Sequence, residues 1–155
     1  MADLLEWQGV DEDALVTLAQ RVSGVLLSGD VVVLRGEVGA GKTTFVRAAA
    51  RSLGVEERVT SPTYQFARGY EGRRGGENIR VNHLDLYRLE GVEEQDALEL
   101  DEYVGSGAVT FLEWAEPALG LLEEPPTVIE LEHATPTTRR VRILGPVAER
   151  LPEDA

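Results

Sequence analysis

The sequence has 155 residues and a mass of 16.9 kDa, which suits one domain with its own hydrophobic core. It contains no cysteine, which excludes disulfide frameworks, cysteine-bound zinc and thiol catalysis. The net charge is −13, from 28 acidic and 15 basic residues, and this excess of negative charge argues against direct binding to a nucleic acid.

No apolar run approaches the roughly 18 residues that a membrane-spanning helix needs. The acidic start at residues 1–6 lacks the basic and apolar parts of a signal peptide. We therefore expect a cytoplasmic protein without a membrane association. We also expect a single domain over residues 1–155, with residues 151–155 forming a frayed acidic tail.

The first predicted element is a helix over residues 10–27, because leucine, alanine and valine recur on one of its faces at helical spacing. Asp11 is suited to cap its start. Residues 31–34 are valine and leucine, apolar on both faces, which is typical of a central parallel strand. A second helix is expected from Thr43 to about residue 53, where Gly54 ends it.

The later elements are mainly strands. A stretch rich in glycine and arginine, residues 71–77, predicts a flexible hairpin tip between two of them. A helix is expected over residues 93–104, before the glycines at 105–107. The predicted strands are 64–70, 79–84, 109–112, 127–131 and 140–144.

Residues 36–43, between the first predicted strand and the second helix, match the phosphate-binding loop G-x-x-x-x-G-K-[ST]. Its glycines let the backbone wrap around a phosphate, so that N–H groups and the positive end of the helix face it. Lys42, the only lysine of the chain, would contact the phosphates, and the Thr43 hydroxyl would bind Mg²⁺. The predicted phosphate-binding residues are Gly36, Glu37, Val38, Gly39, Ala40, Gly41, Lys42, Thr43 and Thr44.

Polar residues at the ends of two other predicted strands add to this loop. Glu113 follows the apolar strand 109–112 and would offer a carboxylate to Mg²⁺ or to the attacking water. His83, Asp85 and Tyr87 would share one strand face, with Asp85 as a further Mg²⁺ carboxylate and His83 orienting water or phosphate. The plainer interpretations are a buried strand with a polar end and a solvated strand face.

Two further segments have open interpretations. Residues 60–64 lie where phosphate-loop switch proteins carry the loop that senses the γ-phosphate, although a plain turn would also fit. Ser61 or Thr63 would supply its hydroxyl and Pro62 would restrain it. The arginines 139, 140 and 142 form either a solvated strand face or a contact to a partner or nucleotide.

Four segments, in this order and spacing, resemble the TsaE family, the P-loop ATPases of bacterial tRNA threonylcarbamoyladenosine biosynthesis. They read GEVGAGKTTF (36–45), SPTY (61–64), HLDLYRL (83–89) and EWAE (113–116). The resemblance spans roughly residues 10–145, and the stretch around residues 73–76 departs from it. It implies an α/β fold, a three-layer P-loop domain with a central mixed, largely parallel sheet.

The resemblance also implies a function. The chain would bind ATP or ADP with Mg²⁺, hydrolyse ATP slowly when alone, and dock on a heterodimer of the threonylcarbamoyl transferase and its inactive paralogue. Strong direct tRNA binding by this chain alone is not expected. The implied catalytic residues are Lys42, Glu113 and Asp85, the implied Mg²⁺ ligands are Thr43, Glu113 and Asp85, and the implied switch loop is Ser61, Pro62 and Thr63. The residues implied to support the site or sense a partner are His83, Tyr87, Arg88 and Trp114, and those implied to wall the adenine pocket are Asp11 and Glu12 with the loop after Leu131.

Two other functions remain compatible with the sequence. A small-molecule kinase would use the same loop, but the chain after Gly36 leaves little room for a substrate-binding insertion and a lid. A nucleotide-gated binding module would use ATP only to switch between two surfaces. Release of inorganic phosphate without an added acceptor would separate an ATPase from a kinase.

Overall fold

The computed structural model describes residues 4–37, 39–59, 67–85, 107–114, 122 and 124–152. Its strands are β1 (Leu4–Val10), β2 (Val31–Gly36), β3 (Ala67–Arg74), β4 (Glu77–Asp85), β5 (Val109–Glu113), β6 (Thr127–Thr135) and β7 (Thr138–Leu144). Its helices are α1 (Glu12–Val25), α2 (Lys42–Ser52) and α4 (Pro146–Arg150).

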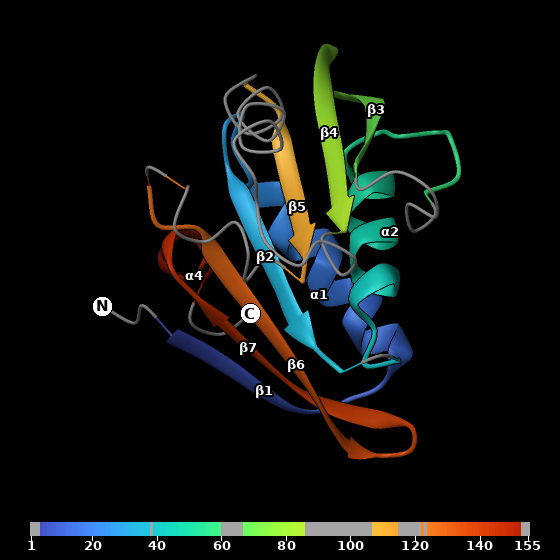
Figure 1. Ribbon diagram of the computed structural model, residues 1–155, viewed down its shortest axis with the longest axis vertical. Helices are drawn as coiled ribbons and strands as arrows, with labels where there is room; N and C mark the ends of the chain where they lie inside the picture. The colour runs from blue at the N-terminus through green and yellow to red at the C-terminus, as the bar shows by residue number, and fades with distance from the viewer. Residues whose placement is uncertain are drawn as a thin grey trace.

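The strands form one seven-stranded mixed sheet in the order β1-β7-β6-β2-β5-β4-β3 (Figure 1). Its centre is parallel, because β2 pairs in parallel with both β6 and β5, and β5 pairs in parallel with β4. The two edges are antiparallel, through β1 with β7, β7 with β6, and β3 with β4. The predicted α/β fold with a central mixed, largely parallel sheet is confirmed.

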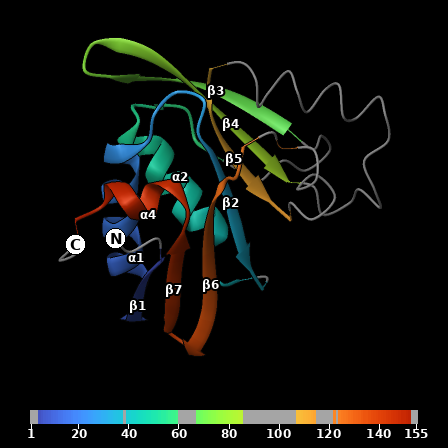
Figure 2. The same ribbon diagram turned by 90° about the vertical axis from the view of Figure 1, so that its left-hand side faces the viewer.

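Figure 2 shows the sheet nearly edge on, with α1, α2 and α4 on one side of it. The core lies between the helices and the face of the sheet that they cover. Side chains alternate along a strand, so every second strand residue points into this core. Its largest fully buried members include Leu15, Leu34, Phe45, Phe111 and Ile129. A three-layer arrangement needs helical cover on the other face as well, and the helix expected at 93–104 lies outside the described residues.

The first helix begins later than predicted, because residues 4–10 form an edge strand that the sequence analysis missed. Val10 ends β1, and the Asp11 side chain caps α1 by accepting a hydrogen bond from the Ala14 N–H at 2.8 Å. The strand is irregular: its register with β7 shifts between Trp7 and Val10, where Gly9 has a φ of 63°. This irregularity and the exposed polar positions hide the alternating pattern.

The predicted flexible hairpin tip at residues 71–77 is wrong. Pairing between β3 and β4 continues to Arg74 opposite Glu77, so the turn is confined to Gly75 and Gly76. The paired stretch packs on the ends of two helices. A Cβ on Gly72 would lie 2.4 Å from the Leu53 carbonyl oxygen, and an Arg74 guanidinium nitrogen donates to the Ser23 carbonyl at 3.0 Å. Tertiary contact therefore orders a segment with a loop-like composition.

The C-terminal part also differs from the prediction, because the expected frayed tail does not begin at Leu151. That side chain is 7% exposed and belongs to the core, while residues 153–155 lie outside the described part. The short helix α4 precedes it, and Arg150 donates to Asp30 at 2.6 Å and to the Val25 carbonyl at 3.1 Å. The hydrogen bond to Asp30 raises the pKa of Arg150 above its usual value.

Candidate functional site

The predicted phosphate-binding loop joins β2 directly to α2 at the carboxyl edge of the parallel strands. The turn is closed by a hydrogen bond from the Ala40 N–H to the Glu37 carbonyl at 3.0 Å, and Val38 lies outside the described residues. The helix then starts with a hydrogen bond from the Phe45 N–H to the Gly41 carbonyl at 2.9 Å. Gly41 is the N-cap and has no side chain to occupy this end of α2, so the helix dipole is directed at the loop.

Two glycines of the loop are required by their surroundings. Gly41 has a φ of 113°, and a Cβ there would lie 2.8 Å from Leu15 Cδ2 of α1. A Cβ on Gly36 would lie 2.6 Å from the carbonyl oxygen of Leu131 on β6. The loop is therefore pressed against α1 on one side and β6 on the other, with a backbone that L-residues rarely adopt.

Lys42 is 6% exposed, an unusual burial for a lysine. Its ammonium nitrogen donates to the Gly36 carbonyl at 2.7 Å, across the loop. The same nitrogen lies 3.7 Å from the ring centroid of Trp114, which is a cation–π contact. These contacts hold a positive charge within the curve of the loop, which is where the sequence predicts the phosphates to bind.

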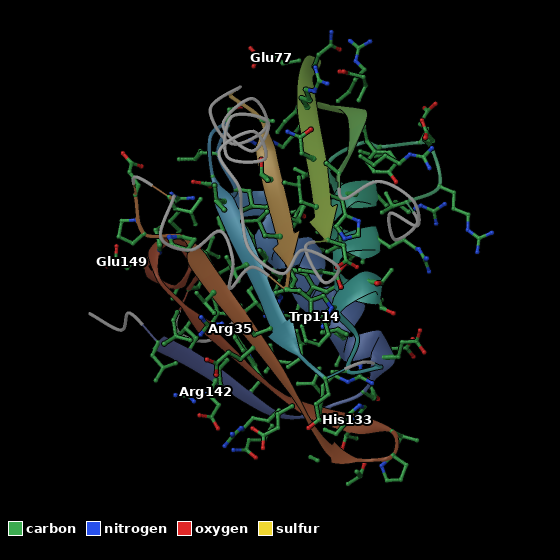
Figure 3. The ribbon with its side chains drawn as sticks, in the orientation of Figure 1. Arg35, Glu77, Trp114, His133, Arg142 and Glu149 are labelled. Carbon is green, nitrogen blue, oxygen red and sulfur yellow. The ribbon has the colours of Figure 1, made fainter. Side chains whose placement is uncertain are left out.

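Trp114 directly follows β5 and has a φ of 55°. Positive φ is uncommon for a bulky residue and signals local strain that the surrounding structure maintains. In Figure 3 the indole lies at the end of β5. This backbone conformation accompanies the placement of the ring against Lys42.

Two acidic residues and a histidine meet beside the loop, as the sequence analysis predicted. Glu113 and Asp85 end the adjacent parallel strands β5 and β4 and are register partners. His83 lies two residues before Asp85, so both point to the same face. Its Nε2 lies 2.5 Å from Glu113 Oε2, and both side chains are buried, at 0% and 3% exposure. His83 Nδ1 is shielded and has no hydrogen-bond partner.

This arrangement has the donors that a magnesium nucleotide needs. Mg²⁺ is usually held by one or two carboxylates together with substrate phosphates, not by an all-protein cage. Thr43 on α2, Glu113 on β5 and Asp85 on β4 supply such a partial set. Among the residues that the structure describes, no three His, Asp or Glu side chains are grouped so that they could hold a metal ion by themselves. The three side chains have the donor chemistry of a Mg²⁺ site that other ligands complete.

Several predicted site residues cannot be placed. The switch-loop residues Ser61, Pro62 and Thr63, together with Tyr87 and Arg88, lie outside the described residues. Of the two predicted adenine-pocket residues, Asp11 caps α1 and thus has a structural role, while Glu12 is exposed on the first turn of that helix.

The arginine cluster of β7 is divided between the two faces of the sheet. Arg140 pairs with Glu132 at 2.5 Å and Arg142 with Glu130 at 3.5 Å, on the face away from the helices. These two fit the solvated strand face that was one of the predicted alternatives. Arg139 points the other way, and its Nη1 would lie 3.5 Å from a Cβ on Gly41. Arg139 was therefore not distinguishable from its neighbours by sequence alone.

No helix in the described ranges is both long enough and apolar enough to cross a membrane.

Comparison with known proteins gives one consistent family. The family profile "Threonylcarbamoyl adenosine biosynthesis protein TsaE" matches residues 10–141. A Streptomyces coelicolor protein named "tRNA threonylcarbamoyladenosine biosynthesis protein TsaE" is 37% identical, covering 83% of this chain and 88% of that protein. A protein of the same name from Bacillus subtilis is 35% identical, covering 77% and 70%. The crystal structure of Bacillus subtilis YdiB superposes with a TM-score of 0.73 at 28% identity, covering 99% and 95% of the two chains.

Proposed function

Because the chain belongs to the TsaE family of tRNA threonylcarbamoyladenosine biosynthesis proteins, we propose that it binds ATP with Mg²⁺ and hydrolyses ATP in support of that modification. One observation carries the proposal. The buried ammonium of Lys42 is fixed inside the loop by the Gly36 carbonyl and the Trp114 ring, beside the Glu113 carboxylate at the end of the next strand.

Each side chain has a distinct role in the proposed reaction. Lys42 and the N–H groups of the loop bind the β- and γ-phosphates and stabilise the charge that develops during transfer. Thr43 and Glu113 would hold Mg²⁺, and the ion would neutralise charge on the phosphoryl oxygens. Asp85 adds a carboxylate for the metal or for the attacking water. His83 keeps Glu113 in one orientation, because a buried carboxylate without a partner is costly.

The partner is proposed from the resemblance and the charge. A net charge of −13 disfavours direct contact with tRNA, so a TsaE-family chain needs another protein to reach its substrate. We propose the heterodimer of the threonylcarbamoyl transferase and its inactive paralogue as that protein, in the cytoplasm. ATP hydrolysis by this chain would then support repeated turnover of the transferase.

The test is phosphate release from MgATP by the purified chain, with no acceptor and then with the heterodimer. Slow release that the heterodimer accelerates supports the proposal. Strict dependence on a small-molecule acceptor would instead indicate a kinase. A Glu113→Ala variant that binds ATP without hydrolysing it separates the ATPase from a nucleotide-gated module, because only the module would still sustain repeated tRNA modification.

A further inference from the structure

Trp114 covers one side of the ammonium on which the proposed phosphate contacts depend. The centroid of its ring lies 3.7 Å from Lys42 Nζ, and the Gly36 carbonyl accepts a hydrogen bond from the same nitrogen at 2.7 Å. An anionic oxygen that accepts a hydrogen bond from an ammonium lies about 2.7–2.9 Å from it, nearer than the ring does. A phosphate oxygen and the indole therefore cannot occupy the same side of Lys42 together.

The ring reaches Lys42 because the backbone leaves the strand conformation at Trp114 (Figure 3). Phe111 points into the core beneath the helices, so Glu113 shares that face, and residue 114 of a continued strand would point to the other. A φ of 55° breaks this alternation and turns the indole back toward the start of α2. An unfavourable backbone conformation of this kind is typical of binding sites and switch regions, where the strain is part of the mechanism.

The neighbour of Trp114 in the chain indicates which phosphate the ring would meet. This inference rests on the proposed function, in which Lys42 contacts the β- and γ-phosphates and Glu113 serves the metal or the attacking water. Attack takes place at the γ-phosphorus, so the side of the loop next to β5 is the γ-phosphate side. Trp114 directly follows Glu113, and its ring therefore covers Lys42 at the γ-phosphate end.

We propose that Trp114 determines the specificity of the site for the length of the phosphate chain. The indole occupies the place of the γ-phosphate beside Lys42, stays there when ADP is bound, and is displaced when ATP binds. ATP then has to replace a cation–π contact that ADP leaves intact. This exchange should lower the affinity for ATP about two- to thirtyfold, which is the equivalent of one such contact.

The first experiment follows the indole itself in the full chain. The chain has two tryptophans, so Trp7→Phe leaves Trp114 as the only one. Trp7 lies on the edge strand β1, outside the site, and its substitution should not alter nucleotide affinity. The β,γ-imido analogue of ATP with Mg²⁺ should change the emission maximum of Trp114 and its quenching by acrylamide, and MgADP should change neither. The same response to both nucleotides, or a response to neither, overturns the inference.

The second experiment compares affinities by calorimetry. Trp114→Leu keeps an apolar side chain but has no π-system, so it should bind the imido analogue about two- to thirtyfold more tightly, with ADP affinity unchanged. Trp114→Phe keeps a ring that attracts cations less strongly than an indole, and its affinity should fall between the two. Thermal unfolding without ligand shows whether both variants are folded, and Trp7→Phe is the matched control.

The outcomes separate this inference from the proposed function. Weaker binding of the analogue by Trp114→Leu overturns the inference, because the ring would then support the γ-phosphate. Equal changes in the affinities for ADP and the analogue also overturn it. A chain that binds neither nucleotide, or whose nucleotide affinity Lys42→Ala leaves unaffected, contradicts the proposed function instead.

Discussion

Replacing Lys42 by methionine separates its role in binding from its role in folding. Methionine keeps most of the stem but removes the ammonium, the hydrogen bond to the Gly36 carbonyl and the contact with Trp114. In the folded chain without ligand, the lost cation–π contact is worth about 0.5–2 kcal/mol. The lost hydrogen bond to a charged group is worth about 1.5–3 kcal/mol. Against these stands the cost of burying the ammonium of a residue that is only 6% exposed, several kcal/mol per ion.

These opposing terms are of similar size, so we expect the free energy of unfolding of Lys42→Met to change by less than about 1 kcal/mol. ATP binding has no such compensation. Loss of a charge-assisted phosphate contact should weaken it by about 1.5–3 kcal/mol, or roughly ten- to a hundredfold, and hydrolysis should be lost. Denaturant unfolding and calorimetric titration with MgATP measure the two quantities. A variant that loses several kcal/mol of stability, or that binds ATP normally, would refute the reasoning.

Three further variants test the carboxylate of the site, the loop glycine Gly41 and the attachment of α4. Glu113→Gln should still bind MgATP but release phosphate at least about a hundredfold more slowly, and a normal rate would remove Glu113 from the mechanism. Gly41→Ala should lower the free energy of unfolding by about 1–3 kcal/mol, because φ is 113° and the new Cβ would press on Leu15; a neutral effect in denaturant titration would contradict this geometry. Arg150→Ala should cost about 1 kcal/mol through the lost pairing with Asp30, and an unchanged melting temperature would show that α4 is held without it.

The central elements of the fold were predictable because their signals are local. The apolar run at residues 31–34 and the glycines before Lys42 predict a strand, a loop and a helix from local sequence alone. Strand β1 was not predictable in this way, since only Leu5, Trp7 and Val10 of its seven residues pack on the core and its register with β7 is irregular. The paired end of β3 could not be predicted from local sequence, because it depends on the close approach of Gly72 to the Leu53 carbonyl, which is distant in the chain.

The same distinction holds for the site. Glu113, Asp85 and His83 could be brought together from the sequence, because neighbouring parallel strands present their carboxyl ends at one edge. The direction of Arg139 could not be predicted, since it depends on the register of β7, and a shift of one residue would exchange it with Arg140.

The contacts of Lys42 explain why the only lysine of the chain lies inside the loop. In a chain whose every other basic residue is arginine, the position inside the loop requires a slender ammonium, 2.7 Å from the Gly36 carbonyl and 3.7 Å from the Trp114 centroid. A guanidinium fork is wider and fixes its donors in a plane, so it does not fit between a carbonyl and a ring in this way. Lys42→Arg should therefore fold but bind ATP weakly despite retaining the charge, and normal binding would show that charge alone, and not shape, selects the residue within the loop.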